Sequence, residues 1–502
     1  MEIKSFEYIA FALCVIVLYY LFSRVRYAQG VIILCASLFF IFMSCGVRSV
    51  VIILLLAAAV YGLGMLIEKQ RKKSKKAARI WLLAGIILVI GCLCYFKFFK
   101  FTYSLLQSML ERHQIVISDL ITPVGMSYYT LSMVAYLSDV YRKKHPAERN
   151  FFYFLIFITY FPAIVEGPIS LYKKIAPQFK EQHAYKSENF IMGFQRCIWG
   201  FFKKAVIADR IGILVAPIIS GGYLGPINLI CIFLYSFQIY ADFSGGIDVI
   251  MGISEMLDIR LTENFKSPLV AKSVTEFWQR WHISLGEFME KYVYYPIVLS
   301  KKTRKVSKLI KNKYIQKVFA ATLASVVVFV VVGIWHGTGW NYVVYGCYQA
   351  FWVSTAVLLA PLYKKVKTAL HINDKSAVWR VFCVIRTFGI LMIGRFFTRA
   401  QDLHQALSLI HRAFIPSFDG MEPLMKNELG LDSLNVLLMV LCIILLIAVD
   451  VAHDRDYHFR ERIARQHIAV RYLIYIAGIF AILVLGVYGA GFDTASFIYG
   501  GF

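Results

Sequence analysis

Long apolar segments constrain the fold of this chain more than any other feature. Of its 502 residues 59% are hydrophobic and only 17% are charged, whereas about a quarter of a soluble domain is charged. Several segments approach the roughly 20 apolar residues that a helix needs to cross a bilayer. The clearest are 10–22, 50–66, 81–95, 318–335, 434–449 and 472–488. We therefore expect an all-α, polytopic membrane protein with about ten to twelve transmembrane or re-entrant helices.

The basic residues indicate how the chain is oriented. The formal net charge is +24, and lysine and arginine lie in short breaks between apolar segments. Cytoplasmic loops carry such an excess, so these breaks are expected in the cytoplasm and nucleic-acid binding is not expected. The first apolar segment has no small-residue cleavage site and is expected to remain as the first helix. The main basic breaks are 69–79, 142–144, 301–317 and 455–471.

The segment between Arg149 and Lys173 does not fit simple alternation across the bilayer. It contains one apolar stretch, interrupted by Pro162, Gly167 and Pro168. A re-entrant segment would return the chain to the side from which it came. Broken backbone at membrane depth is tolerated only when it is buried in protein or lines a cavity. This segment therefore predicts a central cavity.

Ten cysteines lie mostly inside apolar runs, and no pair has CxxC spacing. We expect small buried side chains, with no structural disulfide and no metal site. The sequence has no internal repeat of fixed period. It predicts one domain over residues 1–502, with a catalytic core at 120–350 and a C-terminal helical group at 351–502.

Two histidines are the candidates for chemistry, namely His282 in FWQRWHISLGEF and His336 in VGIWHGTGWNYVVYG. Burying an imidazole among apolar residues is costly unless it is hydrogen-bonded or functional. A satisfied packing histidine is the alternative at each position. A histidine could take the proton of an attacking hydroxyl and return it to a departing thiolate. Because GxSxG is absent, direct transfer assisted by a histidine base is favoured over a covalent acyl-enzyme.

The segment 274–292 has large apolar residues at helical spacing, with polar residues and Gly286 on another face. We expect one amphipathic helix, at the membrane interface or tilted into the protein. The basic loop 301–317 follows it. Such a loop is ordinarily solvated and faces lipid headgroups. A functional alternative is attraction of an anionic donor such as a nucleotide thioester.

Several motifs together resemble the membrane-bound O-acyltransferase family. The main one is YSFQIYADFSGGIDVIMGISEMLDIRLTENFKSPLVAKSVTEFWQRWHISLGEFMEKYVYYPI (235–297), followed by GIWHGTGWNYVVYG. TPVGMSYYTLSMVAYLSDVYR (122–142), FPAIVEGPI (161–169) and FIYGGF (497–502) extend the resemblance over most of the chain. The most similar branch is formed by bacterial subunits that acetylate alginate and related exopolysaccharides. Gly246 replaces a usual aromatic residue, and the basic loop replaces a common Gly-Gly turn.

This resemblance implies that His336 is catalytic and that His282 is a second conserved polar position. In relatives these lie in a central tunnel between a cytoplasmic donor entry and an outward acceptor funnel. Further residues could line or orient the site, or could simply be buried packing groups. They are Asp242, Ser244, Glu276, Arg280, Trp281 and Trp335.

The resemblance also implies a substrate class and partners. An acyl group, acetyl in the first instance, would move from acetyl-CoA or another cytoplasmic acyl thioester toward a hydroxyl of an extracytoplasmic cell-surface polysaccharide. No permanently bound cofactor is expected. A separate extracytoplasmic SGNH-type acyltransferase would be the partner, and the bacterial cytoplasmic (inner) membrane the location. The alternatives are D-alanyl transfer to teichoic acid from a carrier-protein thioester, and a transporter or flippase for a lipid-linked sugar.

Overall fold

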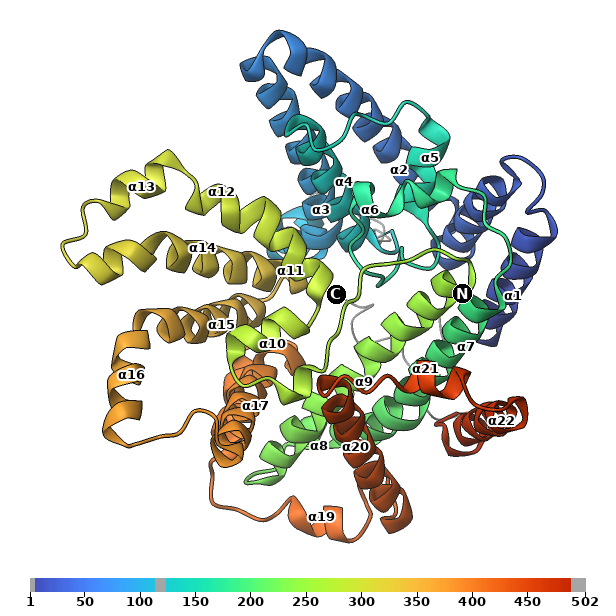
Figure 1. The fold of residues 1–502 in the computed structure, drawn as a ribbon. Coiled ribbons are helices and arrows are strands. Elements are labelled where there is room, and N and C mark those ends of the chain that lie inside the picture. Colours follow the sequence, from blue (N-terminus) through green and yellow to red (C-terminus); the bar gives the residue numbers. More distant parts are fainter. Residues whose placement is uncertain (1–4, 113–122, 489–502) are drawn as a thin grey trace. The chain divides into compact units, whose positions relative to one another are not determined.

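The computed structural model describes residues 5–112 and 123–488, and every regular element in these ranges is a helix (Figure 1). Seven of the described helices are long and apolar enough to cross a membrane, and the bent pair α15 and α16 would make eight. The predicted all-α, polytopic class is therefore confirmed. The expected ten to twelve also counted shorter and broken segments, of which α1 (Phe6–Leu21) is one. The FIYGGF motif at 497–502 lies outside the described residues.

Contacts within the fold divide the chain into two units. The first comprises residues 1–199 and 246–262, and the second comprises residues 200–245 and 263–502. Helix α9 (Ile227–Met256) contributes to both. The single domain predicted over 1–502, with its subdivisions at 120–350 and 351–502, stays a prediction.

Long antiparallel helices form much of the first unit. Helix α2 contains a non-helical residue, Gly46, at φ 74°, and it ends next to α3 within the predicted basic break. The two helices lie side by side (Figure 1). The described helices of the first unit are α1, α2 (Ala28–Lys73), α3 (Lys75–Arg112), α4 (Met126–Tyr141), α5 (Phe151–Thr159), α6 (Tyr172–Ile175) and α7 (Ser187–Phe201). The last two residues of α7 belong to the second unit.

The segment after Arg149 is broken, as its prolines and glycine predicted. Helix α5 ends at Thr159, and the chain then turns. The hydroxyl of Ser37 accepts a hydrogen bond of 3.0 Å from the backbone N–H of Phe161. This bond satisfies a buried main-chain donor that the ended helix leaves without a helical partner. The re-entrant course of the segment stays a prediction.

A buried carboxylate fixes the loop before α5. Glu148 is 6% exposed and accepts hydrogen bonds from the backbone N–H groups of Arg149 and Asn150 at 2.8 and 2.9 Å. The ammonium of Lys180 lies 2.5 Å from the same carboxylate, which also accepts the hydroxyl of Tyr172. Burial opposes ionisation, but these donors together hold the pKa of Glu148 below its usual value. The loop is thus anchored on an ionised side chain.

The second unit carries both candidate histidines. Its C-terminal helix α22 is strongly apolar, yet none of its residues is buried within the described structure. A helix of that kind is stable in lipid rather than in water. The remaining helices are α8 (Asp209–Ser220), α10 (Val274–Arg280), α11 (Ile283–Met289), α12 (Tyr295–Val298), α13 (Lys301–Ser307), α14 (Lys313–His336), α15 (Trp340–Leu358), α16 (Ala360–Ala369), α17 (Ala377–Arg399), α18 (Leu403–Ala413), α19 (Met421–Met425), α20 (Ser433–Asp454), α21 (Phe459–Ala464) and α22 (Ile468–Leu485).

The prediction of one amphipathic helix over 274–292 is wrong. The chain forms α10, breaks at Trp281 and His282, and resumes as α11, which runs into a π-helical turn at Glu290–Tyr294. His282 has φ 50° and ψ 51°, in the left-handed region. Apolar spacing continues across the break, which is why periodicity alone predicts a single helix.

Candidate functional site

A short piece of extended chain holds the break at His282 open. The backbone N–H of Lys266 donates to the carbonyl oxygen of Arg280 at 2.9 Å, and the N–H of Ile283 donates to the carbonyl oxygen of Asn264 at 3.0 Å. Phe265 and Trp281 form an isolated antiparallel bridge. These bonds replace the helical ones that a continuous helix would make, and they stabilise a backbone that costs a non-glycine residue about 1–2 kcal/mol.

The orientation of the His282 ring is set by Asn264. Oδ1 of Asn264 lies 3.2 Å from Nδ1 of His282, and it also accepts from the backbone N–H and the hydroxyl of Ser284 at 3.0 and 2.9 Å. Because the Ser284 N–H can only donate, this atom of the amide is the oxygen. Nδ1 of His282 must then carry the proton, so the neutral ring has its lone pair on Nε2.

Burial keeps His282 neutral. The residue is 1% exposed, and loss of solvation lowers its pKa to about 3. Charging this ring therefore costs free energy at any pH near neutrality. A base so weak suits an orienting or hydrogen-bond-accepting role better than proton abstraction.

One indole lies close to both candidate histidines. The ring centroid of Trp335 is 6.0 Å from that of His282 and 5.0 Å from that of His336. The two imidazole centroids are thus no more than about 11 Å apart, the sum of these distances. His336 is 4% exposed. Phe243 packs its ring edge-on against His282 at 5.0 Å. The structure therefore brings His282, Trp335 and His336 together in one buried aromatic cluster.

Close packing of α14 on α15 places His336, the last residue of α14. A Cβ added at Gly346 would lie 2.4 Å from the carbonyl oxygen of Phe329, and one added at Gly333 would lie 2.4 Å from that of Tyr342. Only glycine allows such backbone contact. At Gly337 the chain leaves the helix in an extended conformation. The glycines of the WHG motif region thus position the histidine by packing.

Asp242 and Ser244 lie on α9 and contact two buried lysines. Nζ of Lys204 lies 2.5 Å from Asp242 and 2.9 Å from Asp209. Nζ of Lys203 donates to Oγ of Ser244 at 2.8 Å. Both lysines lie on a π-helical turn at Phe202–Ala208, a distortion that is frequent at functional sites. These contacts explain why two charged side chains can be buried in an apolar segment.

Glu276 and Arg280 contact charged and backbone groups of their own surroundings. They pair with each other at 2.8 Å, and Arg280 also lies 2.7 Å from Asp454 of α20. Glu276 accepts from the backbone N–H of Lys272 at 2.9 Å, next to the N-cap Ser273. The described contacts make them anchors of α10. Their predicted role in lining the site stays a prediction.

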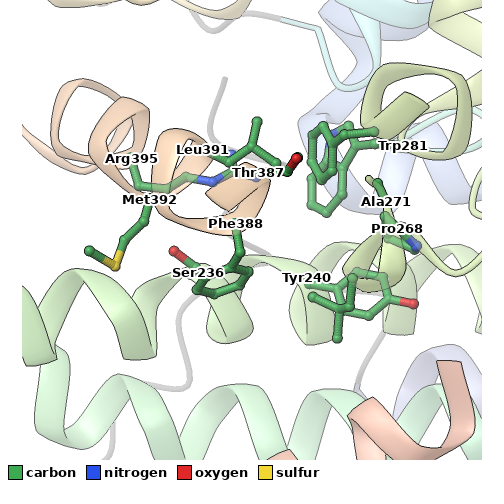
Figure 2. A pocket seen from close by; sticks show the side chains of 12 residues that line it. Ser236, Tyr240, Pro268, Ala271, Trp281, Thr387, Phe388, Leu391, Met392 and Arg395 are labelled. Atoms are coloured by element: carbon green, nitrogen blue, oxygen red, sulfur yellow. The ribbon is translucent and has the colours of Figure 1, made fainter. Parts of the chain in front are cut away.

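Trp281 is 2% exposed and lies in the interior of the second unit. Its ring stacks on Phe277 at 5.4 Å, and the guanidinium of Arg395 lies 5.1 Å from its ring centroid. Figure 2 shows Trp281 facing α17 across a small cavity. Trp281 therefore lines this cavity, and the next residue in the chain is His282.

Sequence reasoning missed Asn264, Lys203, Lys204 and Arg395. The lysines could have been found, because an ionisable residue inside FFKKAVIA is unexpected in an apolar segment. Asn264 carries no such signal. Its importance depends on a fold that brings residue 264 beside residue 282.

Comparison with known proteins agrees with the motif reading. The model of the membrane-bound O-acyltransferase family matches residues 35–398. The chain is 29% identical over 390 residues to a protein named probable alginate O-acetylase AlgI from Pseudomonas syringae pv. tomato, covering 76% of this chain and 68% of that protein.

Two further relatives have other names. A peptidoglycan O-acetyltransferase of Helicobacter pylori is 27% identical and covers 71% of this chain and 69% of its own length. A teichoic acid D-alanyltransferase of Bacillus subtilis is 28% identical and covers 57% and 71%. The family match extends over more than half of the residues and includes both histidine motifs. The chain therefore belongs to the membrane-bound O-acyltransferase family and is an integral membrane acyltransferase.

Proposed function

We propose that this protein moves an acetyl group from acetyl-CoA in the cytoplasm toward a hydroxyl of an extracytoplasmic cell-surface polysaccharide. The observation that carries the proposal is the buried cluster of His282, Trp335 and His336. The names of two relatives support the substrate class, because they refer to acetylation of alginate and of peptidoglycan.

His336 acts as the general base in this proposal. The acceptor hydroxyl oxygen attacks the acyl carbon while His336 takes its proton, and the carbon–sulfur bond then breaks. The proton returns to the departing thiolate, so the acetyl ester and free CoA are the products. His282 stays neutral and orients a reacting group through Nε2, since its low pKa makes it a poor base.

The placement of donor and acceptor rests on charge. The basic segment from Lys301 to Lys317 is largely exposed, which suits both a cytoplasmic surface and the phosphates of CoA. The acceptor side would face away from the cytoplasm of a bacterial inner membrane. An SGNH-type acyltransferase on that side would complete the transfer to the glycan. The tunnel expected from the family resemblance would join the two sides.

The test is acyl transfer by the purified protein in proteoliposomes. Radiolabelled acetyl-CoA is supplied on the donor side, with the polysaccharide and its SGNH-type partner on the other. We expect His336→Ala to lower the transfer rate by about 10²- to 10⁴-fold. His404→Ala, at an exposed position of α18, is the matched control and should leave the rate unchanged.

The same assay separates the rival functions. A D-alanyl thioester of a carrier protein replaces acetyl-CoA in a second arm, and transfer in that arm alone would overturn the acetyl assignment. Movement of a lipid-linked sugar that survives His336→Ala, with no acyl transfer by wild type, would favour a transporter. Full activity of His336→Ala would remove the general base from the proposal.

A further inference from the structure

A buried arginine in the second unit lacks a carboxylate partner. Arg395 is 4% exposed, and among the described residues no ion pair or hydrogen bond engages its guanidinium. Its charged end instead lies 5.1 Å from the ring centroid of Trp281. A cation–π contact offsets only part of the solvation that a buried charge loses. A further partner for the charge, either solvent or an ion, is therefore expected.

Other buried cations of this unit have oxygen partners. Lys204 lies against two carboxylates, and the guanidinium of Arg210 donates to the carbonyl oxygens of Val206 and Leu485 at 2.9 and 2.7 Å. Arg395 thus differs from the other buried cations of the second unit, which have oxygen partners within the chain. The difference points to a partner that is not part of the chain.

A cavity lies where such a partner would bind. It is bounded by α9, the segment 268–281 and α17, and Figure 2 shows Arg395 and Thr387 directed toward Trp281. Arginine side chains on a helix lean toward its N-terminus, which brings Arg395 back toward the turn of Thr387. The volume is about 20 Å³, enough for one or two water-sized species and too small for a phosphate group.

Thr387 supplies a second donor. Its side chain is 1% exposed, and its hydroxyl has no hydrogen-bond partner among the described residues. A buried hydroxyl without a partner costs free energy, so it too indicates an absent ligand. The nearby carboxylate of Asp450 does not fill this role, because it accepts from Tyr240 and from the backbone N–H of Leu269.

We propose that Arg395, Thr387 and Trp281 form a binding site for one small monovalent anion, of the size of chloride. The guanidinium supplies the charge and the Thr387 hydroxyl supplies a hydrogen bond. The other walls are largely apolar, including Phe277, Phe388 and Leu391, and a low dielectric strengthens both attractions. A bound anion would fix α17 against the segment that leads into His282.

The test compares sodium chloride with sodium gluconate at equal ionic strength, using the full-length protein in detergent. We expect chloride to raise the Tm of wild type with the logarithm of its concentration, by about 1 °C at tenfold its dissociation constant, and the fitted dissociation constant is the chloride midpoint. Thr387→Val should shift the chloride midpoint upward at least about fivefold, because one donor is lost. Acetate, which exceeds the cavity, should not replace chloride.

Further variants keep the result interpretable. Arg395→Gln removes the charge and should abolish the effect of chloride on Tm. If that variant does not fold, Arg395→Lys, which keeps the charge with a shorter reach, should still weaken the effect. Arg380→Gln removes a charge from an exposed position of the same helix and should leave the effect of chloride on Tm unchanged. A structure determined in bromide should show an anomalous peak beside Arg395. Equal Tm in both salts, equal midpoints in wild type and Thr387→Val, or water alone in the cavity would overturn the proposal.

Discussion

Oδ1 of Asn264 and Nδ1 of His282 lie 3.2 Å apart, and this contact fixes which nitrogen of the imidazole carries the proton. The same oxygen accepts two hydrogen bonds from Ser284. One amide therefore fixes both the ring and the first turn of α11, so changes at Asn264 should affect chemistry through His282.

Replacing Asn264 by alanine should lower kcat about ten- to hundredfold, the usual effect of losing a residue that orients a functional imidazole. The ring would lose the Asn264 oxygen beside Nδ1, and its tautomer would no longer be fixed by that contact. Acetyl transfer in proteoliposomes measures the effect. Asn373→Ala, in an exposed turn, is the control. An unchanged kcat for Asn264→Ala would show that the contact serves folding alone.

The stability of the protein should fall with acid between about pH 6.5 and 3 because of His282. Its pKa is lowered to about 3 by burial, so in this window the unfolded chain binds a proton that the folded chain does not. One such group contributes up to about 1.4 kcal/mol per pH unit. His282→Asn, which tolerates the left-handed backbone, should flatten this part of the Tm profile. If Tm fell with pH in parallel for wild type and His282→Asn, the acid sensitivity would not come from His282.

The contact between α14 and α15 should not tolerate a methyl group. Gly346→Ala places a Cβ 2.4 Å from the carbonyl oxygen of Phe329, and overpacking of this kind costs about 1–3 kcal/mol. We expect a lower Tm and reduced transfer, since the shift displaces His336. Gly389→Ala is the matched control, because its Cβ would meet no atom within 4 Å. Equal losses in the two variants would remove close packing as the reason.

Ionised Glu148 should stabilise the first unit at neutral pH. Its pKa is held below the usual value by Lys180, Tyr172 and the N–H of Asn150, against the opposing effect of burial. A lowered carboxyl pKa gives stability that is present above the unfolded value and is lost as pH falls through the folded one. Glu148→Gln should therefore lower the free energy of unfolding at pH 7 by about 1–3 kcal/mol, which is measured as a lower Tm.

The difference between wild type and Glu148→Gln should narrow below pH 4.5, the ordinary glutamate value. Exposed Glu181 provides the control substitution, Glu181→Gln, which should change neither Tm nor its pH dependence. A gap that stays constant through the acid range would mean that packing, and not charge, accounts for the loss.

Apolar run length was sufficient to predict the fold class, because the cost of exposing backbone in lipid permits little besides helices. Aromatic surroundings drew attention to His282 and His336, which the structure brings into one cluster with Trp335, and their catalytic role stays a prediction. Periodicity failed at 274–292, since the bonds from residues 264–266 that break the helix come from a different part of the chain. The partners of Asp242 and Ser244 were missed for the same reason. A lysine 38 residues from Asp242 becomes its neighbour only after folding.

Lys204 of the π-helical turn pairs with two carboxylates, those of Asp209 and Asp242. Its neighbour Lys203 donates to the hydroxyl of Ser244. Loss of one member of these ion pairs leaves an uncompensated ion in an apolar interior, whereas removing opposite members together restores neutrality. Residues at these positions are therefore expected to change together in related proteins. The effect of one substitution on stability then depends on whether its partner has already changed.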